Sequence, residues 1–412
     1  MVTYEGLFEA YLDCRVHKSR TNNCIKFTLD AEGNLYDMME AINNRTYKPR
    51  RSICFVVSRP KYREVFAADF ADRIIHHYIR LRLESIIEQE FNDRTFNCRK
   101  DKGTLAGVEQ LKRDIIECSD NYTKDCYVAT VDIKSFFMSI SKKLVEDLVI
   151  KLIDEKYFGD DKDDLRYLCH VILSHAPEEN CIKQSSDSMW EKLPPSKSLF
   201  TNGAGLGMPI GNLPSQMFAN YLLNSLDWAI EKEYGIKYHG RYVDDVYLIA
   251  NDPKDILNAI PKIRAKLKTL ELELSPNKFY MQHYTKGLDF TGAIVKPGRT
   301  YPLNRTVTNF RHSIRHLNMC RTKAQVIKAI ASVNSYLGLL RHYDSYAIRY
   351  NCLKEIDQRL FKWIYIAEDM KVIRFKKKYH PRNRIRYRLN HNYREPLTLP
   401  EPIMDFNEQK GD

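Results

Sequence analysis

The sequence predicts an α+β protein. Short strand-like segments are concentrated in the middle of the chain, whereas helical periodicity dominates both ends. The most informative segment is 241–250, where two apolar, β-prone arms flank the adjacent residues Asp244 and Asp245. A length of 412 residues is too great for one ordinary core and favours two or three packed subdomains.

The N-terminal part of the chain alternates helical and strand-like patterns. Residues 1–50 show helical spacing of apolar residues, and a second long helix is expected over 71–89. Between them, two β-prone runs at 53–57 and 64–67 flank a basic turn, which predicts a hairpin. A basic, glycine-bearing loop at 98–104 leads into another helix. The run 127–132 then has the pattern of a buried strand that ends in Asp132.

The rest of the chain changes from mixed to helical. The expected order is a helical, polar region at 142–199, a flexible glycine-containing loop at 203–212, a helix at 213–222, the hairpin at 241–250, a helix at 256–270 with a turn after it, and a hairpin at 288–295. From about residue 304 the pattern is purely helical, with segments near 305–319, 323–340 and 344–368. The segment 371–394 is densely basic, lacks acidic residues and is interleaved with aromatic residues, which favours nucleic-acid contact.

Composition narrows the range of partners. The formal net charge of +12 indicates a polyanionic partner, with nucleic acid the first candidate and an anionic membrane surface the second. No apolar run is long enough to span a bilayer, and the N-terminus lacks the features of a signal peptide. The ten cysteines include no Cys-x-x-Cys pair, so we expect reduced thiols in a cytoplasmic protein. Cys169, His170, His175 and Cys181 match no common zinc spacing.

Three carboxylates carry the expected chemistry. Asp132 ends one predicted strand, and Asp244 and Asp245 lie at the predicted tip of a hairpin. Adjacent carboxylates repel one another, and a bound divalent cation relieves that repulsion; oxygen ligands of this kind suit Mg²⁺ or Mn²⁺. The alternative interpretation is a surface turn, in which Asp is common. Three carboxylates on one sheet would suit two metal ions that activate a 3′-hydroxyl and hold a triphosphate. Basic residues from nearby turns are available to bind that triphosphate, namely Lys61, Arg63, Arg99 and Lys102.

The order of these segments resembles a reverse transcriptase over roughly residues 50–340. The matching features are the basic strand pair, the strand ending in Asp132, the glycine-rich loop with Ser215, the Tyr242–Asp245 hairpin, the turn with Lys278 and the hairpin with Gly292. The resemblance implies a right-hand polymerase with fingers, palm and an all-helical thumb. It divides the chain into an N-terminal helical extension (1–50), fingers (51–126), palm (127–296, with an insertion at about 142–200), thumb (297–370) and a basic tail (371–412).

The resemblance also implies roles for individual residues. Asp132 and Asp244 would bridge two Mg²⁺ ions, for which Mn²⁺ can substitute, with the Ile133 carbonyl as a further ligand and Asp245 in support. Phe137 falls at the position of the aromatic gate that disfavours ribonucleotides, and Arg63 at that of the arginine that clamps the triphosphate. Lys278 would donate a proton to pyrophosphate. The remaining assignments are nucleotide contacts at Lys61, Ile210, Gly211 and Gln216, and primer–template contacts at Arg99, Lys102, Tyr242, Lys278 and Gly292.

One departure from the family pattern is informative. Most reverse transcriptases carry Gln-Gly-x-x-x-Ser-Pro in the loop after the Asp-bearing strand, whereas this chain has Ile210 for the Gln and Gln216 for the Pro. With the segment 193–199 upstream, this variant resembles the reverse transcriptases of diversity-generating retroelements of bacteria and phages. Those enzymes copy a template-repeat RNA into cDNA with errors at adenines, and the cDNA replaces a variable repeat in a target gene. The resemblance therefore implies RNA, an RNA–cDNA hybrid, dNTPs and a pentameric basic accessory protein, the accessory variability determinant, as partners.

Three alternatives remain open on the sequence. A retron-type or group II intron-like reverse transcriptase would share the chemistry and use another RNA, and the Ile210…Gln216 variant argues against it. A viral RNA-dependent RNA polymerase would usually lack an aromatic gate at Phe137. An RNA-binding protein with an inactive palm is disfavoured because all three carboxylates and Arg63 are present. As a hypothesis for infidelity, Ile210 offers no hydrogen bond near the incoming nucleotide, which can remove about 1–3 kcal/mol of discrimination.

Overall fold

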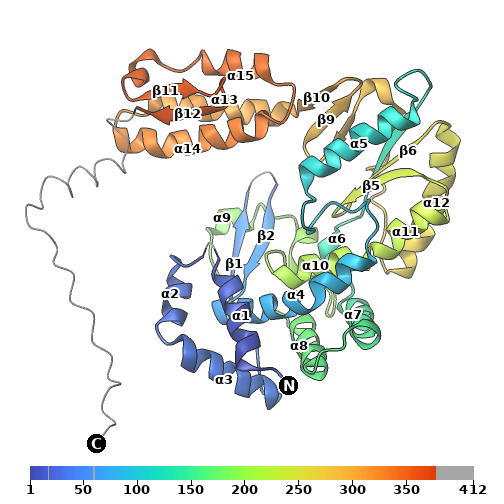
Figure 1. The fold of residues 1–412 in the computed structure, drawn as a ribbon, viewed down its shortest axis with the longest axis vertical. Helices are drawn as coiled ribbons and strands as arrows, with labels where there is room; N and C mark the ends of the chain where they lie inside the picture. The colour runs from blue at the N-terminus through green and yellow to red at the C-terminus, as the bar shows by residue number, and fades with distance from the viewer. Residues whose placement is uncertain (17, 59–60, 377–412) are drawn as a thin grey trace, which may run out of the picture. The chain divides into compact units, whose positions relative to one another are not determined.

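The computed structural model describes residues 1–16, 18–58 and 61–376. It divides into two compact units, Met1–Thr300 and Tyr301–Asp412 (Figure 1). Both helices and sheets are present, which confirms the α+β class. Within the described part of the chain, no helix is both long enough and apolar enough to cross a bilayer. Most of the basic tail predicted at 371–412 lies outside the described residues.

Four helices form the N-terminal part of the first unit, as the periodicity of residues 1–50 and 71–89 predicts. They are α1 (Tyr4–Arg15), α2 (Asn22–Thr28), α3 (Ala31–Asn43) and α4 (Phe70–Glu90). Three of them begin at a side-chain cap, because Thr3, Asp30 and Asp69 each accept a hydrogen bond from a backbone amide of the first turn. The apolar face of α1 packs on α4, and α4 also contacts the chain segment that carries the candidate site.

The predicted basic hairpin belongs to a three-stranded sheet of order β2-β1-β4. β1 (Ser52–Val57) and β2 (Arg63–Ala67) are antiparallel, and alternate residues of β1 are buried. The third strand, β4 (Cys181–Lys183), pairs parallel to β1. It lies inside the region 142–199, which the sequence predicts to be helical and polar. A three-residue strand gives too short a pattern for periodicity to detect.

A four-stranded sheet of order β5-β6-β3-β7 carries the carboxylates. Its strands are β3 (Tyr127–Asp132), β5 (Tyr238–Tyr242), β6 (Asp245–Ala250) and β7 (Tyr280–His283). All neighbouring pairs are antiparallel, and Asp132 lies opposite Asp245. The helices α5 (Thr104–Cys118), α11 (Asn224–Lys232) and α12 (Pro253–Thr269) pack against β5 and β6. These helices cover the apolar residues of β5 and β6.

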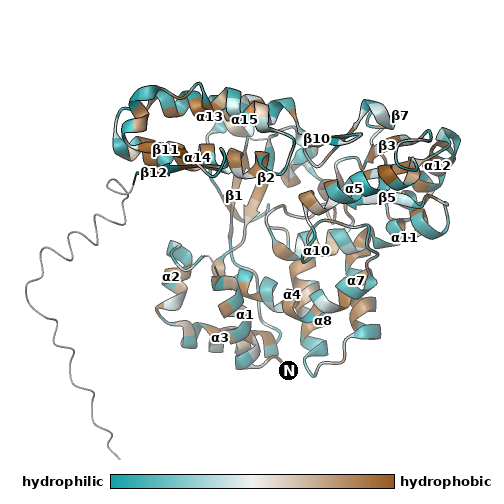
Figure 2. Cartoon of the chain, turned by 45° about the horizontal axis from the view of Figure 1, so that its top comes forward, coloured by the Kyte–Doolittle hydropathy of each residue, from teal (hydrophilic) through white to brown (hydrophobic). Residues whose placement is uncertain are grey.

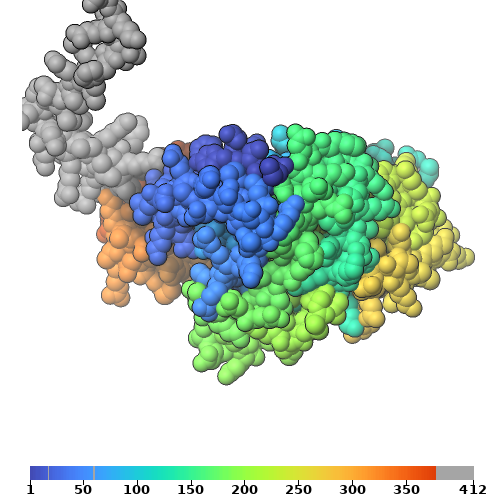
Figure 3. Space-filling model, turned by 90° about the horizontal axis from the view of Figure 1, so that it is seen from below, coloured from blue at the N-terminus to red at the C-terminus, as the bar shows by residue number. Residues whose placement is uncertain are grey.

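The remaining elements of the first unit connect these layers. They are α6 (Phe136–Ser139), α7 (Lys142–Lys156), α8 (Lys162–Ser174), α9 (Asp187–Trp190), the 3₁₀ turns η1 (Pro195–Lys197), η2 (Leu199–Thr201) and η3 (Tyr284–Lys286), α10 (Leu213–Leu222), and the strands β8 (Leu288–Phe290) and β9 (Ala293–Lys296). The strand β10 (Arg299–Pro302) contains the boundary between the two units. The helix α8 contacts α3 and α4, and Figure 3 shows the N-terminal helices beside α7 and α8 on one face.

The second unit has its own apolar core. It contains α13 (Asn304–Met319), α14 (Lys323–Leu340), α15 (Tyr346–Leu353), the 3₁₀ turn η4 (Gln358–Lys362) and the strands β11 (Ile364–Ala367) and β12 (Val372–Phe375). Apolar residues, brown in Figure 2, recur along α13 and α14 and form this core. The expectation of a purely helical segment after about residue 304 is wrong at 364–375. Two β-branched and aromatic runs there flank the turn residues 368–370, all with positive φ, and form a hairpin.

Candidate active site

The central sheet brings the three predicted carboxylates together at one end. Asp132 is the last residue of β3, and its Cα lies opposite that of Asp245, the first residue of β6. Asp244 occupies the turn before β6, and its carbonyl oxygen accepts a 3.3 Å hydrogen bond from the amide of Ile133. The hairpin tip therefore falls one residue earlier than the sequence suggests, at Val243 and Asp244.

Crowding of negative charge perturbs two of these groups. Burial, and then the charge of Asp132, raise the pKa of Asp244. Burial, followed by the charges of Asp244 and Asp132, raises the pKa of Asp245 to about 6, although this side chain still reaches solvent. Like charges so close together are unfavourable without a compensating cation, which is the property expected of a metal-binding cluster.

Lys278 supplies one compensating charge. The turn before β7 is fixed to the end of β3, because the amide of Ser275 donates to the carbonyl of Asp132 over 2.8 Å and Leu274 bridges to Ile133. This attachment places the Lys278 ammonium 2.6 Å from Asp132 Oδ2. The structure thus brings the predicted lysine to the carboxylates, where its ammonium offsets the charge of Asp132.

The carboxylate oxygens of Asp132, Asp244 and Asp245 suit hard divalent cations, although they do not by themselves form a complete coordination site. Among the described residues, no group of three or more His, Cys, Asp or Glu side chains is arranged to hold a metal ion. The three predicted carboxylates lie at one end of the sheet, and one of them forms an ion pair with Lys278. Metal binding by these residues stays a prediction. The pKa values of Asp244 and Asp245 are raised, and a cation bound next to them would lower both.

The turn between β5 and β6 has an unusual backbone. Val243 has φ of +59°, a conformation that β-branched residues rarely adopt. Two hydrogen bonds hold its peptide groups: its amide donates to Asn97 Oδ1 over 2.9 Å, and its carbonyl accepts from Arg241 Nη1 over 3.1 Å. The surrounding structure thus holds a strained turn in place, and this turn carries Asp244.

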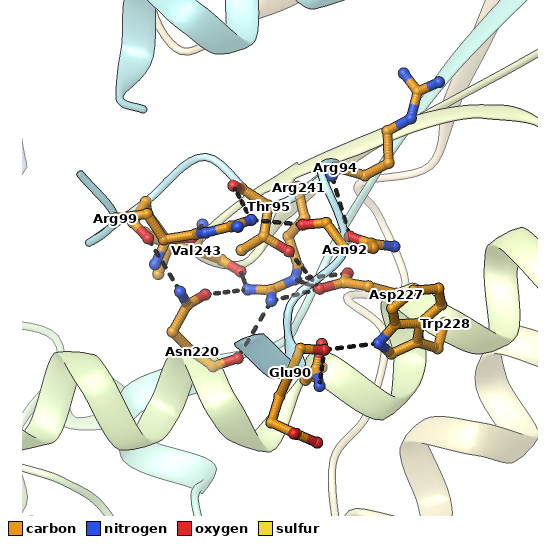
Figure 4. A network of polar contacts seen from close by, with 12 residues as sticks. Glu90, Asn92, Arg94, Thr95, Arg99, Asn220, Asp227, Trp228, Arg241 and Val243 are labelled. Carbon is orange, nitrogen blue, oxygen red and sulfur yellow. Dashed lines mark hydrogen bonds and ion pairs between the residues drawn. The ribbon is translucent and has the colours of Figure 1, made fainter. Parts of the chain in front are cut away.

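Behind this turn lies a buried polar network (Figure 4). The Arg241 side chain is fully buried and forms an ion pair with Asp227, with a shortest N–O distance of 2.6 Å. Its Nη1 also donates to Asn220 Oδ1 over 2.8 Å, and Thr95 Oγ1 donates to Asp227 Oδ2 over 2.7 Å. The Nε, Nη1 and Nη2 atoms of Arg241 all have hydrogen-bond partners, so the network fixes the base of the hairpin of β5 and β6.

Phe137 and Ile210 pack against the same small apolar cluster. Its buried members are Cys54, Phe66, Met138 and Leu199. The carbonyl of Ile210 accepts a 2.8 Å hydrogen bond from the amide of Phe66, which attaches the glycine-containing loop to β2. Gly211 follows with φ of +115°, and a Cβ there would come within 2.5 Å of the Phe66 carbonyl oxygen. Only glycine fits this close approach, so the loop is held against the basic hairpin.

Of the predicted cationic residues, some are available for a ligand and others are not. Lys61 and Arg63 are exposed, and Arg63 is the first residue of β2. Arg99 is corrected, because its side chain is only 4% exposed and binds Glu88 and the carbonyl oxygens of Asn92 and Thr95. These contacts within the protein hold the segment 92–99 against α4. Lys102 lies 3.4 Å from the Asp93 carboxylate at the surface.

The other predicted site residues occupy the expected elements. Tyr242 ends β5 opposite Asp245, and burial raises the pKa of its hydroxyl. Gln216 is exposed on α10 and its Oε1 lies 3.4 Å from Cys98 Sγ. Gly292 has φ of +93° in the turn between β8 and β9. Their contacts with nucleotide or primer–template remain predictions.

Sequence reasoning missed the residues that support the hairpin. Asn97, Asn220, Asp227 and Arg241 were not predicted as site residues, although all four are buried polar side chains. The available signal was a charge or amide inside an otherwise apolar pattern, as at Asp227 in the run 222–230. A second omission is Lys197, which lies within electrostatic reach of Asp132 and Asp244.

Comparison with known proteins decides the family. Residues 48–295, more than half of the chain, match the family described as reverse transcriptase (RNA-dependent DNA polymerase). The chain is a member of the reverse transcriptase family. The matched range contains the four-stranded sheet, the three carboxylates and Lys278, and the reverse-transcriptase fold predicted from the order of the segments is confirmed.

Solved structures similar to this reverse transcriptase include three structures of telomerases from two Candida species. Telomerase from Candida albicans, solved with a TWJ fragment of telomeric RNA, is 11% identical with a TM-score of 0.44 over 76% of this chain and 56% of the other. Apo telomerase from Candida tropicalis is 12% identical with a TM-score of 0.47 over 76% and 57%, and its C-terminally truncated form is 11% identical with a TM-score of 0.41 over 64% and 59%. The reverse transcriptase thus spans less than three fifths of the length of these chains. No curated protein matches.

Proposed function

We propose that this reverse transcriptase is an RNA-directed DNA polymerase that uses two divalent metal ions. The observation that carries the proposal is the register of the central sheet, which sets Asp132 opposite Asp245 with Asp244 in the intervening turn. Phosphoryl transfer asks mainly for positioning and charge neutralisation, and three adjacent carboxylates are suited to that task. Mg²⁺ is the expected cation, and Mn²⁺ is a substitute.

The residues divide the work by position. Asp132 and Asp244 would hold the cations, together with the carbonyl of Ile133, and Asp245 would add negative charge beside them. Bound divalent cations would lower the pKa of a 3′-hydroxyl and neutralise the triphosphate. Lys278, already hydrogen-bonded to Asp132 Oδ2, can deliver a proton at this edge of the sheet. Arg63 offers an exposed guanidinium for phosphate oxygens. Phe137 would exclude a ribose 2′-hydroxyl by its bulk.

Primer extension on an RNA template tests the activity. The parent protein should extend a DNA primer with dNTPs in Mg²⁺ and use rNTPs poorly, whereas Asp244→Asn should lose at least about 100-fold of that activity. A readout independent of activity is the thermal midpoint, which Mg²⁺ should raise in the parent protein more than in Asp244→Asn. Retained synthesis by Asp244→Asn would contradict the assignment.

We further propose that the template is the repeat RNA of a diversity-generating retroelement. The support is the loop in which Ile210 and Gln216 replace the usual Gln and Pro. On this proposal the enzyme copies the RNA with errors at adenines, the cDNA diversifies a target gene, and a pentameric basic accessory protein binds the enzyme and the RNA. A retron-type or group II intron-like enzyme is the alternative, and it would show no preference for errors at adenine.

The error spectrum distinguishes the two. Sequencing of cDNA made on a defined RNA should show misincorporation concentrated opposite adenines. Ile210→Gln should lower that error rate by about 10-fold, because a restored hydrogen bond can penalise poor base-pair geometry. Ile210→Val, which keeps an apolar side chain, is the matched control. Equal error rates in all three proteins would refute the role of Ile210, and a flat spectrum would favour the alternative.

A further inference from the structure

The segment 195–201, formed by η1 and η2, is clamped to the basic hairpin by one buried carboxylate. Glu64 of β2 is 1% exposed. Its Oε2 accepts a 2.6 Å hydrogen bond from Ser198 Oγ, and its Oε1 accepts a 2.8 Å bond from the amide of Leu199. Glu64 is the second residue of β2, directly after Arg63, so this clamp holds segment 195–201 against the strand that begins with Arg63.

The residue that follows this segment, Asn202, attaches it to α6. Asn202 Nδ2 donates over 2.6 Å to the carbonyl of Met138 in α6, and Leu199 packs with Met138 and Phe66. Phe137 and Ile210 pack on this cluster as well. Segment 195–201 therefore connects β2 with α6, the helix that follows the strand ending in Asp132. These two attachments restrict the position of Lys197, the one basic residue of the segment.

Lys197 shares the charge environment of the carboxylates. Its ammonium interacts electrostatically with Asp244, Lys278, Asp132 and Arg63. Its side chain is exposed, and within residues 1–16, 18–58 and 61–376 neither Lys197 nor Arg63 has a carboxylate within ion-pair distance. Partial burial lowers the pKa of the Lys197 ammonium, an effect that a nearby anion would reverse.

The basic residues around the carboxylates differ in whether they form an ion pair within the protein. Lys278 is neutralised by Asp132, so its charge is already matched within the protein. Arg63 and Lys197 are two accessible cations on adjacent segments that are joined by Glu64 and remain unmatched. Their arrangement fits a multiply charged anion that lies beside the metal-binding carboxylates and reaches toward β2.

We propose that Lys197 is a triphosphate-binding residue, which acts with Arg63 on the incoming nucleotide. The inference rests on the proposed polymerase function and deepens it, because it assigns a substrate contact to the insertion between β3 and α10. A triphosphate fits better than a backbone phosphate of the primer–template. On the proposed mechanism, the phosphates of a nucleotide would lie both next to the metal ions and near Arg63.

The test separates nucleotide binding from folding and from duplex binding. Lys197→Ala should raise the KM for dNTP by about 10-fold while kcat changes less than about threefold, and Lys197→Arg should restore KM because the charge is kept. Lys192→Ala, at an exposed lysine five residues earlier, is the matched control and should leave KM unchanged. Primer–template affinity, measured by fluorescence anisotropy, should be equal in all four proteins.

A second measurement does not depend on synthesis. Calorimetric titration with inorganic tripolyphosphate and Mg²⁺ should show about 10-fold weaker binding for Lys197→Ala than for the parent protein. If the parent protein binds tripolyphosphate in this way but makes no DNA, the polymerase function fails and the Lys197 site stands. An unchanged KM and unchanged tripolyphosphate affinity in Lys197→Ala would overturn the site. Weaker duplex binding with an unchanged KM would also overturn it, in favour of a backbone-phosphate contact.

Discussion

At the scale of single residues, the candidate site is defined by charge that the protein itself does not balance. Asp132 has a partner in Lys278, whereas Asp244 and Asp245 have raised pKa values. A folded state that disfavours ionised carboxylates loses stability as they ionise. Such a loss of folding stability is typical of functional sites, where the same carboxylates attract a cation or a cationic ligand.

Asp245→Asn tests this directly. The pKa of Asp245 is about 6 in the folded state against an ordinary value of 3.8, so rising pH ionises the group more readily in the unfolded chain. The contribution of Asp245 to stability is therefore present below about pH 4 and is lost as pH rises through about 6. We expect the thermal midpoint of Asp245→Asn to exceed that of the parent protein above pH 6, and the difference to vanish near pH 4.

The matched control is Asp37→Asn, at an exposed carboxylate on α3. Its midpoint should differ from that of the parent protein by a constant amount over the same pH range. If Asp245→Asn behaves like this control, the repulsion among the three carboxylates is too weak to support the interpretation of the site.

Single residues also show where prediction from sequence succeeds. Asp132, Asp244 and Asp245 were found because each lies at the end of a β-prone run, and strand ends meet in a sheet. The environment of Arg99 was not foreseeable, because its burial depends on Glu88 and on backbone carbonyls that only the folded loop brings together. Whether a basic residue can bind a ligand or is instead paired within the protein depends on contacts that form only in the folded chain.

At the scale of elements, the loop before α10 is held to β2 at one point. Gly211 has positive φ, and its Cα lies against the Phe66 carbonyl. Gly211→Ala should destabilise the protein by about 2–4 kcal/mol, because the Cβ would clash with backbone that cannot move freely. Urea unfolding of the parent protein and the variant measures the difference.

Gly205→Ala is the control for that substitution. Gly205 also has positive φ, +74°, but a Cβ there meets nothing within 4 Å. Its cost should therefore be limited to the backbone conformation, about 1–2 kcal/mol. Equal costs at the two positions would show that the contact with Phe66 is unimportant.

The hairpin turn gives a further prediction at this scale. Asn97→Ala removes the acceptor for the Val243 amide and leaves the Arg241–Asp227 ion pair intact. Because the amide then loses its protein partner, the turn should relax and carry Asp244 with it. We expect kcat for primer extension to fall by about 10-fold with little change in the KM for dNTP. Asn97→Asp, which keeps an acceptor, should retain more activity than Asn97→Ala.

Hairpins whose turns contain glycine or proline were predictable, whereas β4 and the hairpin of β11 and β12 were not. The hairpins at 52–67 and 288–296 have β-prone residues on each side of turns that contain Pro60 and Gly292. The strand β4 pairs with a strand far away in the sequence, and the turn between β11 and β12 contains no glycine or proline, so their assignment depends on the pairing itself. Tertiary pairing supplies the information that local periodicity lacks.

At the scale of the whole molecule, the net charge of +12 should govern nucleic-acid affinity. The affinity for an RNA–DNA duplex should fall steeply with salt, since each phosphate contact releases counterions. Replacing Arg384, Arg386 and Arg388 of the basic tail by Gln should make the dependence of log affinity on log salt shallower, by about one unit for each lost phosphate contact.

The control removes equal charge from another part of the chain. Lys254, Lys262 and Arg264 are exposed on α12, which packs against the central sheet. Their replacement by Gln should leave the salt dependence unchanged if the tail provides the contacts. Identical slopes for the two triple variants would assign no special role to the tail.

The α+β class and the membership of the reverse transcriptase family followed from the order of several motifs along the sequence. Each motif is a short continuous segment, so the order of the motifs can be identified before any contact between segments is known. The division into fingers, palm and thumb is a statement about contacts between distant segments, and it stays a prediction from the resemblance.

The parallel pairing of β4 with β1 has a practical consequence. β1 is the middle strand of its sheet only because residues 181–183 cover one side of it. A shortened variant that lacks the insertion would expose a row of unpaired amides and carbonyls on β1, and such an edge can recruit the same strand of another molecule. Trimming this region to obtain a smaller enzyme would therefore favour aggregation, unless a charged residue or a proline were introduced on the exposed edge.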